Sequence, residues 1–346
     1  MSLDLTPLDA APRLLFEIPL RPIQGQRFQP TGFPGLGAAT FQTGEGTSLL
    51  VESAQSMANR LERVTWDEAR DELRAELAGL SHVRVERKGS FLTDSILEAN
   101  RLNSPYLLEG RNKSFFDQLK ADLGGLEEGP IDRRKLAETL LRFDVGCLLH
   151  GVFLAKKDLA GGRLRVSRAL SSFIEADGVR VAASGGVKND HVNPSGVTKD
   201  GFGNVPFARD EFTADRITLY VNLDLGQIRG YGLGTDVQRL LVLLALYKLR
   251  LLLDGSLRLR SFCDLQPVSD EVAAGRPTGF RLPSTADLRS EVQAAIEACR
   301  QRMVVTTVTF DDELKKAKNT NRTEVGAATE GEAVGGDDGA GEGDEV

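Results

Sequence analysis

The stretch RITLYVNLDLGQIRGYGLGTDVQRLLVLLALYKLRLLLDG, residues 216–255, carries the clearest fold signal in the chain. Its first ten residues alternate between apolar and other side chains, which predicts a half-buried strand. A glycine-rich connection over 226–234 then leads into an apolar helix that begins at Thr235 and ends near Gly255. Residues 257–262, LRLRSF, predict another strand, so this part of the chain should form a strand–helix–strand unit.

A matching unit is predicted near the N-terminus. Residues 13–21 alternate like a half-buried strand, and residues 49–64 fit a strand end that turns into a short helix. Two such units with insertions between them predict an α+β protein that is compatible with a βαββαβ core, which is the RRM-like or ferredoxin-like fold.

The rest of the chain would elaborate this core. A body of this length predicts either two domains or one core with large insertions. Thr65 and Glu68 form a capping box at the start of a predicted helix. The predicted elements are a helix over 65–80, a helical region over 93–150 interrupted at 124–130, a strand over 163–170, a long irregular segment over 183–209, a helix over 285–302 and a strand over 303–310.

Charge is distributed unevenly along the 346 residues. The formal net charge is −7, but the segment from Glu324 to Val346 holds eight acidic residues and no basic one, so residues 1–323 carry about +1. Few apolar residues follow Asn319, which predicts a disordered acidic tail over 319–346. A negative net charge argues against a general nucleic-acid binder. Because residues 1–323 are nearly neutral, however, local basic surfaces are still possible.

Several function classes lack sequence support. The widely spaced Cys147, Cys263 and Cys299 predict neither disulfides nor a cysteine zinc site and fit a reducing cytoplasm. No secretion signal is expected, and the most apolar run, 240–253, is too short to cross a bilayer. The three histidines show no metal-ligand spacing, and no nucleophilic serine motif occurs, so we expect no metal, cofactor or catalytic site.

Three segments could meet a phosphate or an RNA strand. The glycines of 226–234 with Arg229 before a helix suit either an anion site or a tight strand–helix connection. The basic run over 155–168 could follow a phosphate backbone or could be a solvated strand edge. The 183–209 segment mixes cations with phenylalanines, which is typical of single-strand binding but also of a surface excursion.

A family resemblance connects these segments. From about residue 13 to 265, the motifs RFQPTGFPGLGAATF, LLVESAQSMANRLE, LLHGVFLA, GGRLRVSRALSSFIEA, SGGVKND, GFGNVPFARDEFTA and NLDLGQIRGYGLG resemble the backbone subunit of the type I-G (formerly I-U) CRISPR surveillance complex, Cascade. That family is a RAMP-superfamily group of the Cas-seven kind. The resemblance implies an RRM-like palm, here over 1–318, with a helical insertion over 93–150 and a thumb-like insertion over 183–209.

The resemblance also implies a function. Such subunits bind CRISPR RNA, line up as a helical filament of copies, join other Cascade subunits and present the guide for pairing with target DNA; they are not enzymes and have no membrane partner. Together with the local charge arguments, the resemblance implies the following RNA-binding residues: Arg27, Gln29, Thr31, Ser53, Gln55, Ser56, Asn59, Arg60, Lys156, Lys157, Arg163, Arg165, Arg168, Lys188, Asn189, His191 and Arg229.

Two other functions stay open from sequence. One is a RAMP-type endonuclease that processes RNA with His150 or His191 as general acid or base. The other is an unrelated enzyme for a phosphate ligand, built around residues 226–235.

Overall fold

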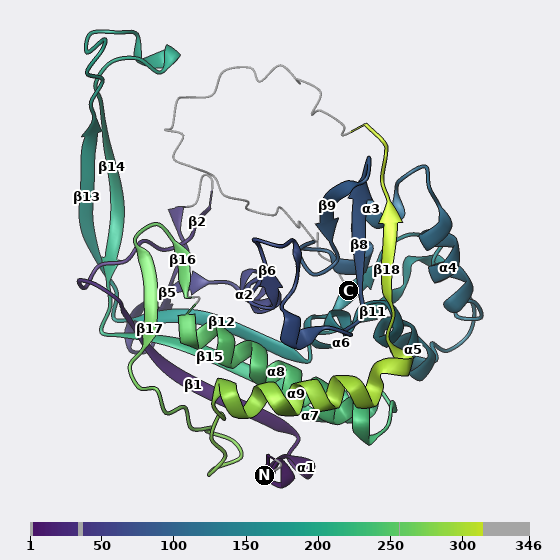
Figure 1. The fold of residues 1–346 in the computed structure, drawn as a ribbon. Helices are drawn as coiled ribbons and strands as arrows, with labels where there is room; N and C mark the ends of the chain where they lie inside the picture. The colour runs from purple at the N-terminus through teal and green to yellow at the C-terminus, as the bar shows by residue number, and fades with distance from the viewer. Residues whose placement is uncertain (1–2, 34–36, 256, 314–346) are drawn as a thin grey trace. The chain divides into compact units, whose positions relative to one another are not determined.

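The computed structural model describes residues 3–33, 37–255 and 257–313, drawn in colour in Figure 1. The predicted acidic tail over 319–346 lies outside the described residues. The chain divides into two compact units, one formed by Met1–Ala182 with Glu211–Asp312 and the other containing Ala183–Asp210. Each unit is described by itself.

The first unit is built on an RRM-like sheet. Its four central strands are β1 (Arg13–Pro22), β12 (Leu170–Asp177), β15 (Arg216–Asp224) and β17 (Cys263–Pro267). They lie in the order β17-β1-β15-β12, with antiparallel neighbours throughout. Helix α2 (Ala54–Arg63) lies between β1 and β12 in the chain, and α8 (Thr235–Gly255) joins β15 to β17. This is the βαββαβ topology predicted from the sequence, and the fold class is α+β.

The alternation of apolar and polar side chains along these strands explains why they form. Leu14, Phe16, Ile18 and Leu20 of β1 are all buried, and β15 pairs with β1 so that Phe16 lies opposite Val221. Most residues of α8 are buried because α2 and α9 (Thr285–Cys299) pack against it. The sheet and these helices share one hydrophobic core. Figure 1 shows α8 and α9 lying alongside each other by the sheet.

Short strands widen the palm sheet at both edges. β5 (Gly46–Glu52) and β4 (Thr40–Thr43) extend it beyond β12, and β16 (Arg258–Arg260) extends it beyond β17. The remaining short elements of the first unit are α1 (Thr6–Asp9), β2 (Gly32–Phe33), β3 (Gly37–Ala38), η2 (Arg101–Asn103), β10 (Val152–Leu154), η3 (Ala160–Gly162) and η5 (Arg300–Arg302).

The predicted helical region packs beside a second, smaller sheet. Strands β8 (His82–Arg87) and β9 (Ser90–Asp94) form a hairpin, and β18 (Val305–Thr309) adds parallel to β8. The region over 93–150 contains α3 (Pro105–Leu108), α4 (Ser114–Asp122), α5 (Arg133–Phe143) and α6 (Gly146–His150), and the predicted interruption falls between α4 and α5. The last helix and the last strand are therefore confirmed, although β18 is not part of the palm.

The predicted helix over 65–80 is wrong. The Thr65 hydroxyl donates to the carbonyl of Glu62 (2.6 Å) at the end of α2 instead of capping a new helix. β6 (Trp66–Asp67), β7 (Glu72–Leu73) and the 3-10 turn η1 (Ala75–Leu77) follow. Trp66 is buried and stacks on Phe91, with ring centroids 5.7 Å apart, so a tertiary contact outweighs the local helical pattern.

Two other segments differ from their predictions. The glycine-rich connection begins as a helix, α7 (Leu225–Gly230), capped by Asp224, whose carboxylate accepts from the Gln227 amide. The predicted strand over 163–170 contains only β11 (Leu164–Val166), and β12 starts separately after a break.

The second unit contains a hairpin where the sequence predicted an irregular segment. β13 (Arg180–Lys188) pairs with β14 (Val205–Thr213), and η4 (Thr198–Asp200) lies in the loop between them. Glycine is required inside this hairpin because a Cβ at Gly185 would lie 2.5 Å from the carbonyl oxygen of Phe207. The glycines that suggested irregularity are thus compatible with paired strands; only residues 189–204 between them lack strands.

No helix in the described ranges is long and apolar enough to cross a membrane.

Candidate nucleic-acid interface

A carboxylate at the end of β5 gathers several predicted RNA-binding side chains. Glu52 is 3% exposed and receives the Ser56 hydroxyl, the Arg60 Nε (3.0 Å) and a guanidinium nitrogen of Arg260. We call these four residues the Glu52 cluster. It fixes the start of α2 against strand β16, so two arginines are held in place by one buried negative charge.

Two other polar residues at the start of α2, Ser53 and Gln55, also bond within the protein. Ser53 is the N-cap, and its hydroxyl accepts from the Ser56 amide (3.2 Å). Gln55 receives a hydrogen bond from Arg168 and donates to the Ala99 carbonyl (3.5 Å). The Asn59 side-chain oxygen is buried and has no hydrogen-bond partner among the described residues.

The turn between β16 and β17 is attached to this cluster. Arg60 donates to the carbonyls of Arg258 (3.3 Å) and Leu259 (2.6 Å). Arg260 donates to the Gln29 carbonyl (3.2 Å), and the Gln29 amide donates to the Phe262 carbonyl (2.9 Å). The fold thus brings together residues near 29, near 60 and near 260.

Some side chains around this turn face solvent. Arg27 is 56% exposed and lies 3.3 Å from Glu211, while Thr31 is half-buried. Arg258 is 77% exposed and lies 3.6 Å from Asp264. The pattern LRLRSF predicted only a strand and did not single out Arg258 and Arg260; the alternation of these arginines with leucines was the available signal.

The basic run over 155–168 separates into anchored and exposed side chains. Lys156 pairs with Glu109, and Arg163 donates to the carbonyls of Leu126 (2.7 Å) and Gly129 (3.0 Å). Burial, with the nearby Arg101 guanidinium, lowers the pKa of Arg168. Lys157 is exposed, and Arg165 is exposed beside the Phe153 ring, 4.9 Å from its centroid.

We therefore expect substitutions of the exposed residues of this run to affect RNA binding, and substitutions of the anchored residues to affect stability. Lys157→Ala and Arg165→Ala should each weaken RNA binding and reduce the slope of log K against log salt by about 1, as expected for a lost phosphate contact. Arg163→Ala should instead lower stability, because its guanidinium holds two backbone carbonyls. Fluorescence anisotropy over a salt series measures the first effect, and urea unfolding measures the second. Unchanged RNA affinity in Lys157→Ala and Arg165→Ala would contradict a phosphate role for these residues.

Three predicted residues belong to the hairpin unit. Lys188, Asn189 and His191 are exposed there, and Lys188 donates to the Gly201 carbonyl (3.4 Å). Asp190 orders the loop by accepting from the amides of Val192 (2.9 Å), Asn193 (2.9 Å) and Gly203 (2.9 Å); these bonds lower the pKa of Asp190.

The Arg229 side chain bonds to backbone carbonyls of the N-terminal segment. Its guanidinium donates to the carbonyls of Asp9 (3.2 Å) and Ala11 (2.7 Å), which holds the N-terminal segment on α7. Of the two interpretations left open by the sequence, this geometry favours a tight connection over an anion site at 226–234.

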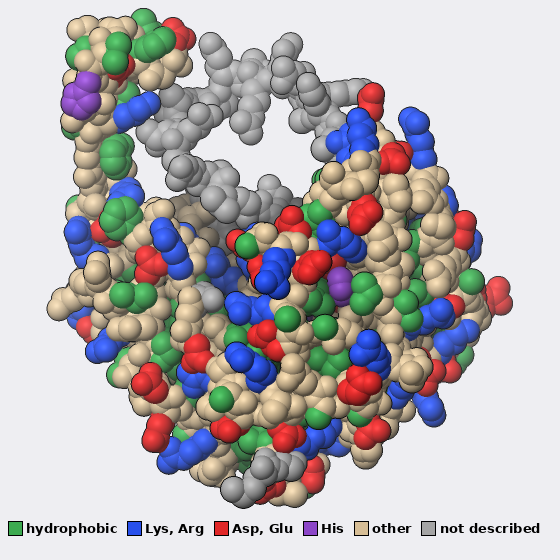
Figure 2. Space-filling model, viewed as in Figure 1, with side chains coloured by type: hydrophobic (Ala, Val, Ile, Leu, Met, Phe, Trp, Pro, Cys, Tyr) green, Lys and Arg blue, Asp and Glu red, His purple; other side chains and the backbone are tan. Residues whose placement is uncertain are grey.

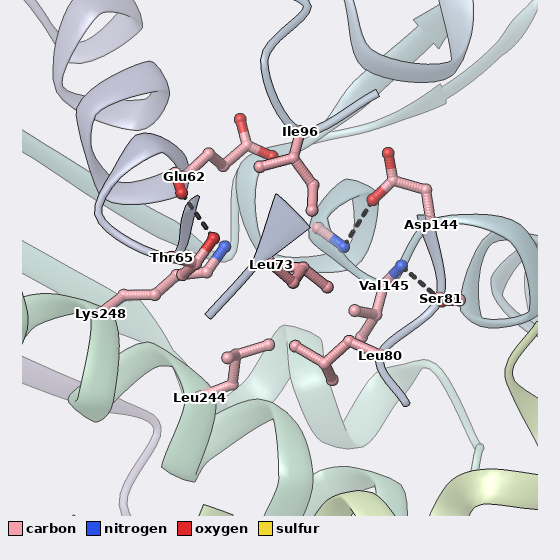
Figure 3. A pocket seen from close by; sticks show the side chains of 11 residues that line it. Glu62, Thr65, Leu73, Leu80, Ser81, Ile96, Asp144, Val145, Leu244 and Lys248 are labelled. Atoms are coloured by element: carbon pink, nitrogen blue, oxygen red, sulfur yellow. Dashed lines mark hydrogen bonds between the residues drawn. The ribbon is translucent and has the colours of Figure 1, made fainter. Parts of the chain in front are cut away.

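His150 is enclosed in a buried ionic cluster. It is 1% exposed, its Nε2 lies 3.0 Å from Lys248 Nζ, and burial together with the Lys248 charge holds the pKa of His150 well below its usual range. Figure 3 shows Glu62, Asp144 and Lys248 around a neighbouring cavity of about 10 Å³, with Leu244 and Leu80 on its other side. A cavity of this size suits about one water molecule.

The described part of the chain contains no group of three or more His, Cys, Asp or Glu side chains that could hold a metal. On the face shown in Figure 2, Lys and Arg side chains are interspersed with Asp and Glu side chains and form no single basic field. On this face, positive charge is offered by individual exposed cations and not by one continuous basic surface.

The palm and its insertions define an RRM-like α+β protein. The model of the family described as "CRISPR-associated protein GSU0053 (Cas_GSU0053)" matches residues 14–181, which include β1, α2 and β12. The chain is thus similar to a CRISPR-associated family over slightly less than half of its length.

A chain from a solved structure titled "CRISPR RNA-guided surveillance complex, pre-nicking" is also similar, at 15% identity and a TM-score of 0.40, covering 76% of this chain and 75% of that chain. No curated protein matches the chain.

Proposed function

We propose that this protein is a CRISPR RNA-binding backbone subunit of a type I-G interference complex. Copies would assemble head to tail along one guide RNA through an interface that does not close on itself, and would present the guide for pairing with target DNA. The match of residues 14–181 to a CRISPR-associated family is the observation that carries this proposal, because it includes half of the RRM-like palm.

The surface chemistry supports a scaffold more than an enzyme. The titratable groups near His150 are buried, and the predicted side chains of Ser56 and Arg60 in α2 bond to Glu52 within the protein. Exposed cations on separate elements, such as Arg27, Lys157 and Arg258, suit phosphate contacts that depend little on base sequence.

The proposal predicts salt-dependent RNA binding. The full chain should bind a CRISPR RNA and a scrambled RNA of the same length with similar affinity, and log K should fall linearly as log salt rises. Anisotropy with both RNAs measures this, and gel analysis of the same samples monitors cleavage. Absence of binding, or metal-independent cutting of repeat RNA, would contradict the proposed scaffold role.

A further inference from the structure

Phe153 and Arg165 form an exposed pair of a ring and a guanidinium on a two-stranded hairpin. They lie directly opposite each other in β10 and β11, and the Arg165 Cζ lies 4.9 Å from the centre of the Phe153 ring. Their neighbours along the strands, Val152, Leu154 and Leu164, are buried, whereas Phe153 is 46% exposed and Arg165 is also exposed. The outer side of this hairpin therefore offers solvent an aromatic ring with a cation already placed against it.

The hairpin that carries the pair is held to the rest of the protein next to both strands. The Ala155 amide, directly after β10, donates to the side-chain oxygen of Asn103 (3.2 Å). Arg168, two residues after β11, donates to the side-chain oxygen of Gln55 in α2. The pair thus stands on a preorganised base, which reduces the entropy lost when a ligand stacks on it.

Positive charge on this hairpin is only partly compensated. Residues 156–168 contain five basic side chains and one acidic residue, Asp158. In the part of the chain that the structure describes, Lys156 is the one member of this basic run that pairs with a carboxylate, that of Glu109. Lys157 and Arg165 are exposed. The local excess of positive charge favours a polyanion as the ligand over a basic protein segment.

A ring and a guanidinium side by side suit single-stranded RNA, because unpaired bases stack on aromatic rings and on guanidinium planes and the phosphates attract positive charge. We propose that Phe153 and Arg165 together form a stacking site for an unpaired base of bound single-stranded RNA, and that Arg165 also meets a neighbouring phosphate. This inference rests on the proposed RNA-binding function and adds to it a residue that touches a base.

Phe153→Leu tests the stacking role. Leucine removes the ring but keeps an apolar side chain and every charge, so the melting temperature should change by less than about 3 °C. Loss of stacking should weaken RNA binding about 5- to 150-fold. The slope of log K against log salt should stay the same, because no phosphate contact is lost. Phe153→Tyr, which keeps a ring, should bind like the unaltered chain.

Phe41→Leu is the matched control, because it makes the same chemical change at another exposed site. Phe41 lies on β4 and is 38% exposed, and no cation lies over its ring among the described residues. This variant should leave RNA affinity unchanged. A loss equal to that of Phe153→Leu would overturn the inference, since the ring–guanidinium pair would then have no special role.

The probe is a single-stranded RNA that carries 2-aminopurine, whose fluorescence is quenched by stacking. We expect extra quenching with the unaltered chain and with Phe153→Tyr, and its loss with Phe153→Leu. Weaker binding of Phe153→Leu together with a lower salt slope would overturn the inference, because the ring would then only hold Arg165 against a phosphate.

The same experiment distinguishes this inference from the proposed function. If Phe153→Leu binds and quenches like the unaltered chain, only this inference fails, and loss of a co-purifying protein subunit would then assign the pair to a protein contact. If the unaltered chain binds no RNA, the proposed function fails and this inference fails with it.

Discussion

Replacing Arg101 with alanine should lower the free energy of unfolding by about 3–5 kcal/mol. Arg101 is 4% exposed and Glu62 is 1% exposed, and two guanidinium nitrogens meet both carboxylate oxygens at 2.9 and 2.6 Å. Arg101→Ala leaves the Glu62 charge buried without its partner, close to the negative charge of Asp144. Urea unfolding with a constant m-value measures the loss.

A double variant tests the cause. Arg101→Met with Glu62→Leu removes both charges, so it should recover most of the stability that Arg101→Ala loses. As a matched control, Arg300→Ala breaks an exposed pair with Glu297 and should change stability by less than about 0.5 kcal/mol. Equal losses in Arg101→Ala and Arg300→Ala would show that burial of the pair is unimportant.

Asp144→Asn should stabilise the fold at pH 7 by about 2–3 kcal/mol. Burial and the nearby Glu62 charge raise the pKa of Asp144 from its ordinary 3.8 to about 6, a shift that corresponds to about 3 kcal/mol. A Cβ on Gly146 would lie 2.8 Å from Glu62 Oε1 and 2.9 Å from Asp144 Oδ1. The two carboxylates therefore lie close to each other beside Gly146. Asparagine keeps the Oδ1 atom that accepts from the Gly146 amide (2.8 Å) and removes the charge.

The sign of the pH dependence follows from the raised pKa. The folded state binds the Asp144 proton more tightly than the unfolded state, so the cost of this carboxylate is present above about pH 6 and disappears as the pH falls toward 4. The stability difference between Asp144→Asn and the unaltered chain should shrink over the same range. Comparing the two proteins cancels the titration of His150. Exposed Asp200→Asn, which removes a surface carboxylate, is the control for the chemical change alone; a pH-independent difference for Asp144→Asn would refute the assignment.

The strands and helices of the palm were predictable because the sequence patterns that indicate them are local. Alternation along 13–21 and 216–225, together with the continuous apolar helix after Thr235, reports burial directly. The segment after Thr65 was not predictable in this way, because its spacing fits a helix until Trp66 meets Phe91 from another strand. In the hairpin over 180–213, glycines that suggest a loop instead permit close approach of two strands.

The candidate interface was less predictable than the fold. Ser56 and Arg60 were selected for the chemistry of their side chains, but the sequence did not show that Glu52 and Arg260 engage them. Likewise, Arg163 and Arg229 are basic residues whose donors are directed to backbone carbonyls. Whether a cation faces solvent depends on contacts between distant segments, and a single sequence does not contain that information.

Native mass spectrometry of the full chain, expressed with and without a CRISPR RNA, tests the central claim most directly. The account predicts particles that contain one RNA and several copies of the chain, which dissociate as salt is raised because phosphate contacts are lost. Without the RNA, the same particles should be absent. A monomer that carries no RNA under both conditions, or an oligomer of identical size with and without RNA, would contradict it.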